Sequence, residues 1–153
     1  MFARLINYFS SHALVGLLTL PLLAGGCSTF NYEWKMASKH PHPAGSLEGR
    51  WEGTWKSDSN GHNDRLRCLI SKQPGGHYLA RYYANYGRML TFGYTARLDA
   101  QKTAGAFKFA GSADLGWYAG GVYRYEGRAE GTNFFSTYRC PSDHGVFQMT
   151  RPR

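Results

Sequence analysis

The sequence predicts an all-β protein, an eight-stranded antiparallel up-and-down barrel. After Leu47, apolar and polar residues alternate in eight runs, as they do in strands with one buried face. Seven short connections, nearly all rich in Gly, Asn, Asp, Ser or Pro, separate these runs, which is typical of hairpins. No window of this region has a convincing 3.6-residue period of an amphipathic helix. A β-sandwich is the alternative, because alternation alone does not distinguish the two architectures.

The predicted strands follow one another in a meander, because each connection is too short to let the chain cross the sheet. An open meander would leave two unpaired edges and an uncovered apolar face, and closure into a barrel removes both problems. The strands are predicted at residues 50–56, 64–71, 77–85, 88–98, 104–114, 121–129, 133–140 and 145–151.

Alternation also predicts which side chains point into the barrel. In the run 121–129 the charged residues share one face, which must be the wet one, so the opposite face points inward. Tyr83 belongs to an outward row of the run 77–85. Large and small residues alternate inside, as a tapering small barrel requires. The inward rows are Tyr78, Ala80, Tyr82 and Ala84; Leu90, Phe92, Tyr94, Ala96 and Leu98; Phe107, Phe109, Gly111 and Ala113; and Tyr123, Tyr125, Gly127 and Ala129.

The N-terminal segment, residues 1–26, has the pattern of a signal peptide. A short stretch containing Arg4 precedes an apolar run of 14 residues, 13–26, which is too short for a comfortable membrane span. The sequence Ala-Gly-Gly directly before Cys27 resembles the lipobox of bacterial lipoproteins. The resemblance implies that Cys27 is acylated and becomes the first residue of the mature chain. Ser28, in place of an aspartate, implies sorting to the outer membrane in a Gram-negative cell.

The domain organisation follows from this anchor. Residues 27–47 are predicted to be a flexible tether, because they are polar, contain two prolines and lack a regular period. Residues 48–153 form the barrel domain. The chain has a formal net charge of +8 at pH 7, but its basic residues are scattered singly and form no phosphate-binding cluster. We therefore expect a solvated surface that can lie near anionic membrane, and no nucleic-acid partner.

The stretch GRWEGTW, residues 49–55, places a glycine two residues before a tryptophan twice. It resembles the G-x-W motif on the first strand of the calycin superfamily, the lipocalins and fatty-acid-binding proteins. In that family an arginine near the chain end often packs over the tryptophan at the closed end of the barrel. The phrase GTWKS is most similar to the fatty-acid-binding version, which implies that Gly53 and Trp55 close the barrel under Arg151. Trp51 has the same parity as Trp55, so it should also point inward and add bulk.

No catalytic constellation stands out, and the sequence predicts a non-enzymatic protein without a metal ion or cofactor. His62 and Asp64 lie in one predicted hairpin loop, and Asp143 and His144 lie in another. Both stretches are turn formers in their own right, which explains these residues better than acid–base chemistry does.

Two further pairs of residues leave alternatives open. Cys68 and Cys140 belong to an exported protein and can form a disulfide, but the sequence does not show whether they pair. Trp117 and Tyr118 interrupt a turn with two large aromatic side chains. They form either a plug that closes one barrel end, which we favour, or a contact at the rim for a ligand, a membrane or a partner.

The function expected first is that of an outer-membrane lipoprotein, facing the periplasm, whose barrel binds a small hydrophobic or amphipathic molecule. A cavity of roughly 300 Å³ or more among the inward aromatics would favour this function. A packed lumen would favour the alternative, a filled barrel that acts as a protein-interaction, structural or inhibitor module of the cell envelope. Exposure at the cell surface is the alternative location. The candidate lining residues are Tyr82, Phe92, Tyr94, Phe107, Phe109, Tyr123 and Tyr125.

Overall fold

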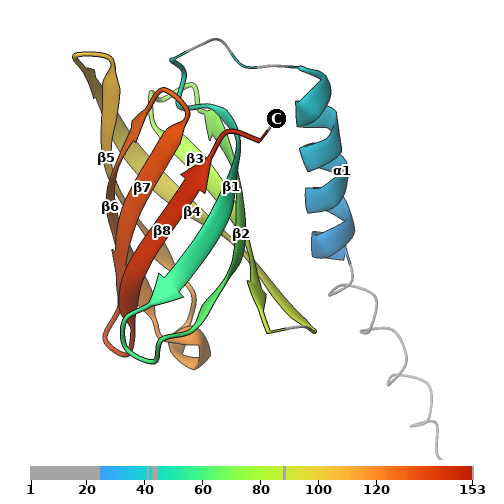
Figure 1. Cartoon of the computed structure of the whole chain (residues 1–153), viewed down its shortest axis with the longest axis vertical. Coiled ribbons are helices and arrows are strands. Elements are labelled where there is room, and N and C mark those ends of the chain that lie inside the picture. The colour runs from blue at the N-terminus through green and yellow to red at the C-terminus, as the bar shows by residue number, and fades with distance from the viewer. Residues whose placement is uncertain (1–24, 41, 43–44, 88, 153) are drawn as a thin grey trace, which may run out of the picture.

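The computed structural model describes residues 25–40, 42, 45–87 and 89–152, and the predicted signal peptide lies outside them except for its last two residues (Figure 1). The side chain of Cys27 also lies outside the described part. Within these residues, eight antiparallel strands form a closed barrel in chain order, and β1 pairs with β8 to complete it. The predicted up-and-down barrel is therefore confirmed, and the sandwich alternative is wrong. The strands are β1 (Gly49–Ser57), β2 (Asn63–Lys72), β3 (Tyr78–Tyr86), β4 (Leu90–Thr103), β5 (Ala106–Asp114), β6 (Val122–Glu130), β7 (Asn133–Arg139) and β8 (His144–Thr150), with a helix, α1 (Gly25–Lys39), before them and a short 3-10 helix, η1 (Trp117–Ala119), between β5 and β6.

The two ends of the barrel differ because consecutive strands run in opposite directions. The connections β1–β2, β3–β4, β5–β6 and β7–β8 all lie at one end, which we call the open end. The other three connections, the segment that enters β1 and the residues after β8 lie at the opposite, closed end. In Figure 1 the closed end is at the top and the open end, with η1, is at the bottom.

The predicted inward rows are buried or half-buried, except at the start of β4. Ala80 and Tyr82 on β3, Ala96 and Leu98 on β4, and Tyr125 on β6 are at most 1% exposed. Leu90 and Phe92, by contrast, are exposed. The pairing of β4 with β5 runs only from Arg97 to Thr103, so the first half of β4 extends beyond it in a hairpin with β3.

The closed end is sealed around Trp51. The Arg151 guanidinium lies 3.8 Å from the centroid of the Trp51 ring, and it donates hydrogen bonds to the carbonyl oxygens of Ser46 and Arg50. The Trp51 indole N–H donates to the Leu47 carbonyl oxygen at 2.9 Å. Burial lowers the pKa of Arg151 to about 10. This guanidinium and indole therefore form a cation–π pair at the closed end, with Trp51 in place of Trp55, the tryptophan expected from the calycin resemblance.

The expectation that Arg151 covers Trp55 is wrong. Because β8 runs antiparallel to β1, with Glu52 opposite Thr150, the residue after β8 meets the beginning of β1. Trp55 lies toward the open end, where its indole N–H donates to the Asn85 carbonyl oxygen at 2.9 Å. Gly53 has a structural role between the two tryptophans, because a Cβ at this position would lie 2.0 Å from the carbonyl oxygen of Gln148.

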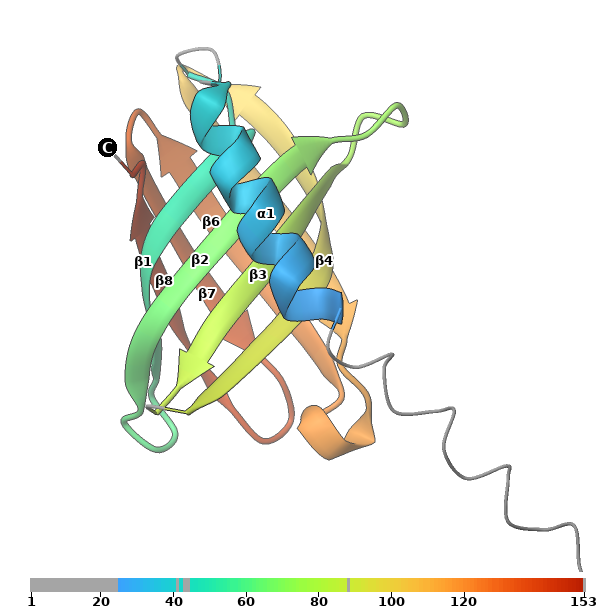
Figure 2. The same cartoon turned by 90° about the vertical axis from the view of Figure 1, so that its right-hand side faces the viewer.

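The predicted tether differs from the structure, in which residues 25–39 form the helix α1. Phe30 and Trp34 lie one turn apart and face the barrel, and Phe30 is only 3% exposed. The Phe30 ring stacks on Tyr83 with a centroid separation of 4.9 Å. The Arg67 guanidinium lies 5.2 Å from the Phe30 ring and 5.4 Å from the Trp34 ring, and Arg81 forms an ion pair with Glu33. Figure 2 shows α1 lying across the outer wall over β2 and β3.

Candidate ligand-binding cavity

A cavity of about 490 Å³ lies at the open end of the barrel. Its volume is within the range of about 300–1,000 Å³ that is typical of small-molecule sites. Its walls are mostly apolar and aromatic, and they come from strands on all sides of the barrel and from the connection between β5 and β6. The lining residues are Trp55, Leu66, Ala84, Asn85, Tyr86, Leu90, Thr91, Phe92, Tyr94, Leu115, Ala119, Tyr123, Tyr138, Asp143 and Phe147.

Stacked aromatic rings form the floor of the cavity. Tyr82 stacks on Tyr94 and on Tyr125, with centroid separations of 5.1 and 5.9 Å. Phe147 packs against Tyr82 at 5.3 Å. The opposite half of the lumen is filled by a second aromatic group, in which Phe134 contacts both Trp51 and Phe109. Among the described residues, aromatic side chains thus fill the barrel from the closed end to its middle, and the cavity lies at the open end.

The phenol oxygens in this floor lie in a low-dielectric environment. Tyr82 Oη and Tyr125 Oη are buried and make no hydrogen bond within the part of the chain that the structure describes. Burial raises the pKa of Tyr82, Tyr94 and Tyr125. The three phenols therefore remain neutral well above the pH at which a solvated tyrosine ionises.

The polar groups of the cavity are few, and one of them is a carboxylate. Asp143 accepts hydrogen bonds from Ser57 Oγ at 2.6 Å and from Tyr138 Oη at 3.1 Å. Among the described residues that line the cavity there is no lysine or arginine. An anionic headgroup inside would consequently meet Asp143 without a cationic partner, whereas a neutral apolar group would meet aromatic walls.

One side of the cavity lies where β4 and β5 are not paired. Leu90, Phe92 and Tyr94 line it from the part of β4 that precedes the β4–β5 pairing. Leu115 and Ala119 line it from the connection that contains η1. The wall between the β3–β4 hairpin and η1 therefore consists of side chains rather than of a continuous strand ladder.

His62 and Asp64 hold the loops of this end together. The Gly87 N–H donates to Asp64 Oδ2 at 2.6 Å, and this hydrogen bond lowers the pKa of the Asp64 carboxyl group. The His62 ring stacks on Tyr86 at 4.1 Å and lies 4.9 Å from Trp55. These contacts fasten the β1–β2 loop to the β3–β4 hairpin, in agreement with the structural role predicted for this pair.

The predicted lining residues divide between the cavity and the packed core. Phe92, Tyr94 and Tyr123 line the cavity. Tyr82 and Tyr125 do not line the cavity but pack beneath Tyr94, which does. The expectation that Phe107 and Phe109 line it is wrong, because these residues are near the start of β5 at the closed end. Sequence reasoning missed two lining residues, Tyr138 on β7 and Phe147 on β8, which the same alternation could have identified.

Cys68 and Cys140 are buried free cysteines, so the possible disulfide does not form in this structure. Cys68 lies on β2 between Leu66 and Ile70, all of them at most 1% exposed, and burial raises the pKa of its thiol. Cys140 Sγ lies 3.4 Å from Ser142 Oγ in the β7–β8 connection. Cys68 is therefore packed as a small apolar group, whereas the Cys140 thiol lies beside a hydroxyl group.

The plug expected from Trp117 and Tyr118 is also wrong. Trp117 is 92% exposed and Tyr118 is 75% exposed, because η1 projects beyond the strands (Figure 2). These two side chains therefore lie on the exposed surface of the open end, and the contact at the rim stays a prediction.

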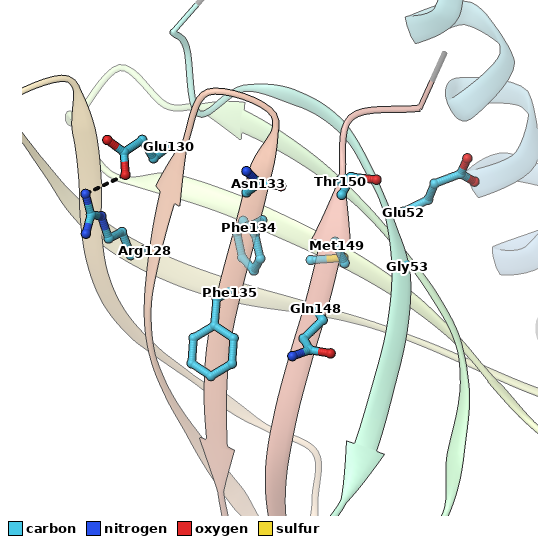
Figure 3. Close-up of a pocket in the computed structure, with 10 residues that line it drawn as sticks. All are labelled: Glu52, Gly53, Arg128, Glu130, Asn133, Phe134, Phe135, Gln148, Met149 and Thr150. Carbon is cyan, nitrogen blue, oxygen red and sulfur yellow. Dashed lines mark hydrogen bonds and ion pairs between the residues drawn. The ribbon is translucent and has the colours of Figure 1, made fainter.

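A second hollow, of about 410 Å³, lies on the outer wall over β6, β7, β8 and β1 (Figure 3). Arg128 and Glu130, which contribute to it, form an ion pair with each other, and Phe135 projects from β7 beside Gln148 (Figure 3). This groove lies between outward side chains on the curved surface of the sheet. It offers less enclosure than the cavity at the open end.

No helix in the described part of the chain is long and apolar enough to cross a membrane. The described residues also contain no group of three or more His, Cys, Asp or Glu side chains placed to hold a metal ion. Comparisons with protein-family models, with curated proteins and with solved structures found no match to this chain.

Proposed function

We propose that this protein is a membrane-anchored envelope lipoprotein whose barrel binds a small hydrophobic or amphipathic ligand without catalysis. The observation that supports this proposal is the apolar cavity of about 490 Å³ at the open end. Large apolar cavities with few polar groups are the usual sites for small ligands. The anchor is acylated Cys27, supported by the lipobox-like sequence before it. The proposed location is the outer membrane, facing the periplasm.

The chemistry of the cavity favours a neutral apolar group over a free carboxylate. The described lining residues include Asp143 and no basic side chain, so a fatty-acid carboxylate inside would be repelled rather than paired. An acyl or aromatic group would instead contact Trp55, Phe92 and Phe147. The ligand class is therefore an uncharged apolar molecule, or a lipid whose chain enters while its headgroup stays in water.

A fluorescence titration tests the cavity. The neutral fluorophore N-phenyl-1-naphthylamine is added to the purified protein in the absence of lipid, and its emission is followed. Ala84→Trp adds an indole to the cavity wall, and we expect it to weaken binding by about tenfold or more. The matched control is Ala110→Trp, which adds the same side chain to the exposed outer face of β5.

Equal binding by native protein and Ala84→Trp would show that the fluorophore does not use this cavity. Native mass spectrometry of protein purified from its own host then identifies the natural ligand. A co-purifying apolar molecule supports the proposal. A protein that carries no ligand and binds no probe leaves the alternative function.

The alternative is a protein-interaction, structural or inhibitor module of the cell envelope. The observation that favours it is the packed lumen between Trp51 and Tyr82, together with exposed aromatic side chains at the open end. Binding of the neutral fluorophore in the cavity, with loss in Ala84→Trp, argues against this alternative.

A further inference from the structure

The exposed apolar side chains gather at one end of the molecule. Among the described residues, nine large hydrophobic side chains are exposed. Seven of them belong to the β3–β4 hairpin, to η1 in the β5–β6 connection, or to the start of β6. Monomeric proteins rarely expose a contiguous apolar patch of this kind without a use for it. We call these seven residues the rim: Tyr86, Met89, Leu90, Phe92, Trp117, Tyr118 and Val122.

The rim surrounds the mouth of the cavity. Tyr86, Leu90 and Phe92 belong to both the rim and the cavity lining, so the apolar surface continues from outside to inside. Met89 and Trp117, at the tips, are each 92% exposed. The β1–β2 loop at the same end is polar, with Asp58, Ser59 and Asn60 in sequence. The apolar surface therefore covers one side of the open end, beside the unpaired first half of β4.

The helix α1 directs the predicted anchor to the same end. Its last turn precedes the segment that enters β1 at the closed end, and Trp34 lies 5.4 Å from the Arg50 guanidinium on β1. One turn before Trp34, Phe30 stacks on Tyr83. Tyr83 lies on β3, three residues before the rim residue Tyr86 at the open end. Cys27 comes almost one further turn before Phe30, toward the open end. Figures 1 and 2 both show α1 running along the wall in this direction.

We infer that the rim docks into the interface of a lipid bilayer, with the mouth of the cavity facing the lipid. This inference deepens the proposed function and rests on it for the anchor at Cys27. Trp and Tyr side chains prefer the border between acyl chains and headgroups, because each combines an apolar ring with a polar group. Met89 and Leu90 add apolar side chains of the kind that enter the acyl region. The bilayer is favoured over a protein partner because the anchor and the rim converge on one end.

This orientation specifies the source of the ligand. The apolar surface is continuous from the rim through Leu90 and Phe92 to the cavity floor, so an acyl chain can pass between bilayer and cavity without crossing water. The absence of a cationic residue among the described lining side chains fits a chain whose headgroup remains at the membrane surface.

Tryptophan quenching by brominated lipid tests the inference. The protein, as the cell processes it, is reconstituted into vesicles of phosphatidylethanolamine and phosphatidylglycerol that contain acyl chains brominated near the headgroup. The chain has four tryptophans, and Trp117 is the one that we place in the bilayer. We expect lipid quenching of the native protein and clearly weaker quenching in Trp117→Phe, where the remaining quenching comes from Trp55 in the cavity. Trp34→Phe is the matched control, and its quenching should equal that of the native protein.

Two results would overturn the inference. Equal lipid quenching in native protein and Trp117→Phe would place the rim outside the bilayer. Protection of Trp117 from aqueous acrylamide without quenching by brominated lipid would show that a second copy or another protein covers the rim. Neither result affects the lipid-free titration of the cavity or the mass of acylated Cys27, so failure of the rim and failure of the proposed function are measured separately. If Cys27 carries no acyl chain, the same quenching is measured after the protein is added to vesicles.

Discussion

The buried phenols in the cavity floor predict a sharp loss of stability at alkaline pH. Burial raises the folded-state pKa of Tyr82, Tyr94 and Tyr125, whereas in the unfolded chain a tyrosine ionises with a pKa near 10. A raised folded-state pKa means that the folded protein retains protons that the unfolded chain releases. The stabilising contribution is therefore complete below about pH 10 and is lost as the pH rises above it.

The magnitude follows from the difference in proton binding. Together the three phenols lower the free energy of unfolding by roughly 4 kcal/mol at about pH 11 and by roughly 8 kcal/mol at about pH 12. Because small domains have total stabilities of about 5–15 kcal/mol, we expect the barrel to unfold cooperatively between about pH 11 and 12.

The assay follows two signals during one alkaline titration. Far-ultraviolet circular dichroism reports the barrel, and phenolate absorbance reports ionisation of the eleven tyrosines of the chain. We expect the final part of the absorbance change to coincide with the loss of β-sheet signal. The reasoning is refuted if all the tyrosines ionise near pH 10 while the circular dichroism remains that of the folded barrel.

Three further substitutions test contacts described above. Tyr82→Phe removes a buried hydroxyl that makes no hydrogen bond within the described residues. It should therefore raise the free energy of unfolding, measured by urea titration at neutral pH, by about 1 kcal/mol. A decrease would show that the hydroxyl has a hydrogen-bond partner. Arg151→Met removes the guanidinium over Trp51 and should lower the free energy of unfolding by about 2 kcal/mol. Arg139→Met, at an exposed position, is its control, and equal losses in the two variants would contradict a stabilising Arg151–Trp51 contact. Phe30→Ala should accelerate amide hydrogen exchange in α1 by about tenfold or more, whereas Tyr32→Ala, on the exposed side of the helix, should not.

Much of the barrel could be predicted because each strand carries a two-residue period that reports burial. The predicted run 121–129, for example, corresponds to β6 at Val122–Glu130 with the expected faces. Alternation reports only two faces, however, and not what covers the outer one. Tyr83 points outward as predicted, yet it is buried because α1 lies over it. The helix itself has no broad apolar stripe. It contacts the wall through the rings of Phe30 and Trp34 and through the ion pair between Glu33 and Arg81.

The site could be predicted only in part, for reasons of position along the strands. Parity places Phe109 and Tyr94 inside the barrel, but it does not indicate which end is packed. That information depends on register: Phe109 lies beside Phe134 at the closed end, and Tyr94 reaches the cavity. The Arg151 contact was assigned to the wrong tryptophan for the same reason. Antiparallel pairing of β8 with β1 would have been enough to select Trp51.

The early end of the β4–β5 pairing bears on the length of ligand that the proposed site could accept. A fully walled cup limits the length of its contents, because the whole molecule must fit inside. Here the pairing stops at Arg97, and the wall toward η1 is formed by side chains such as Leu115 and Phe92. Under the proposed function, a long ligand would push these side chains apart and leave part of itself outside the barrel. Selection would then act on the thickness of the inserted segment and on its lack of charge, and not on the length of the chain.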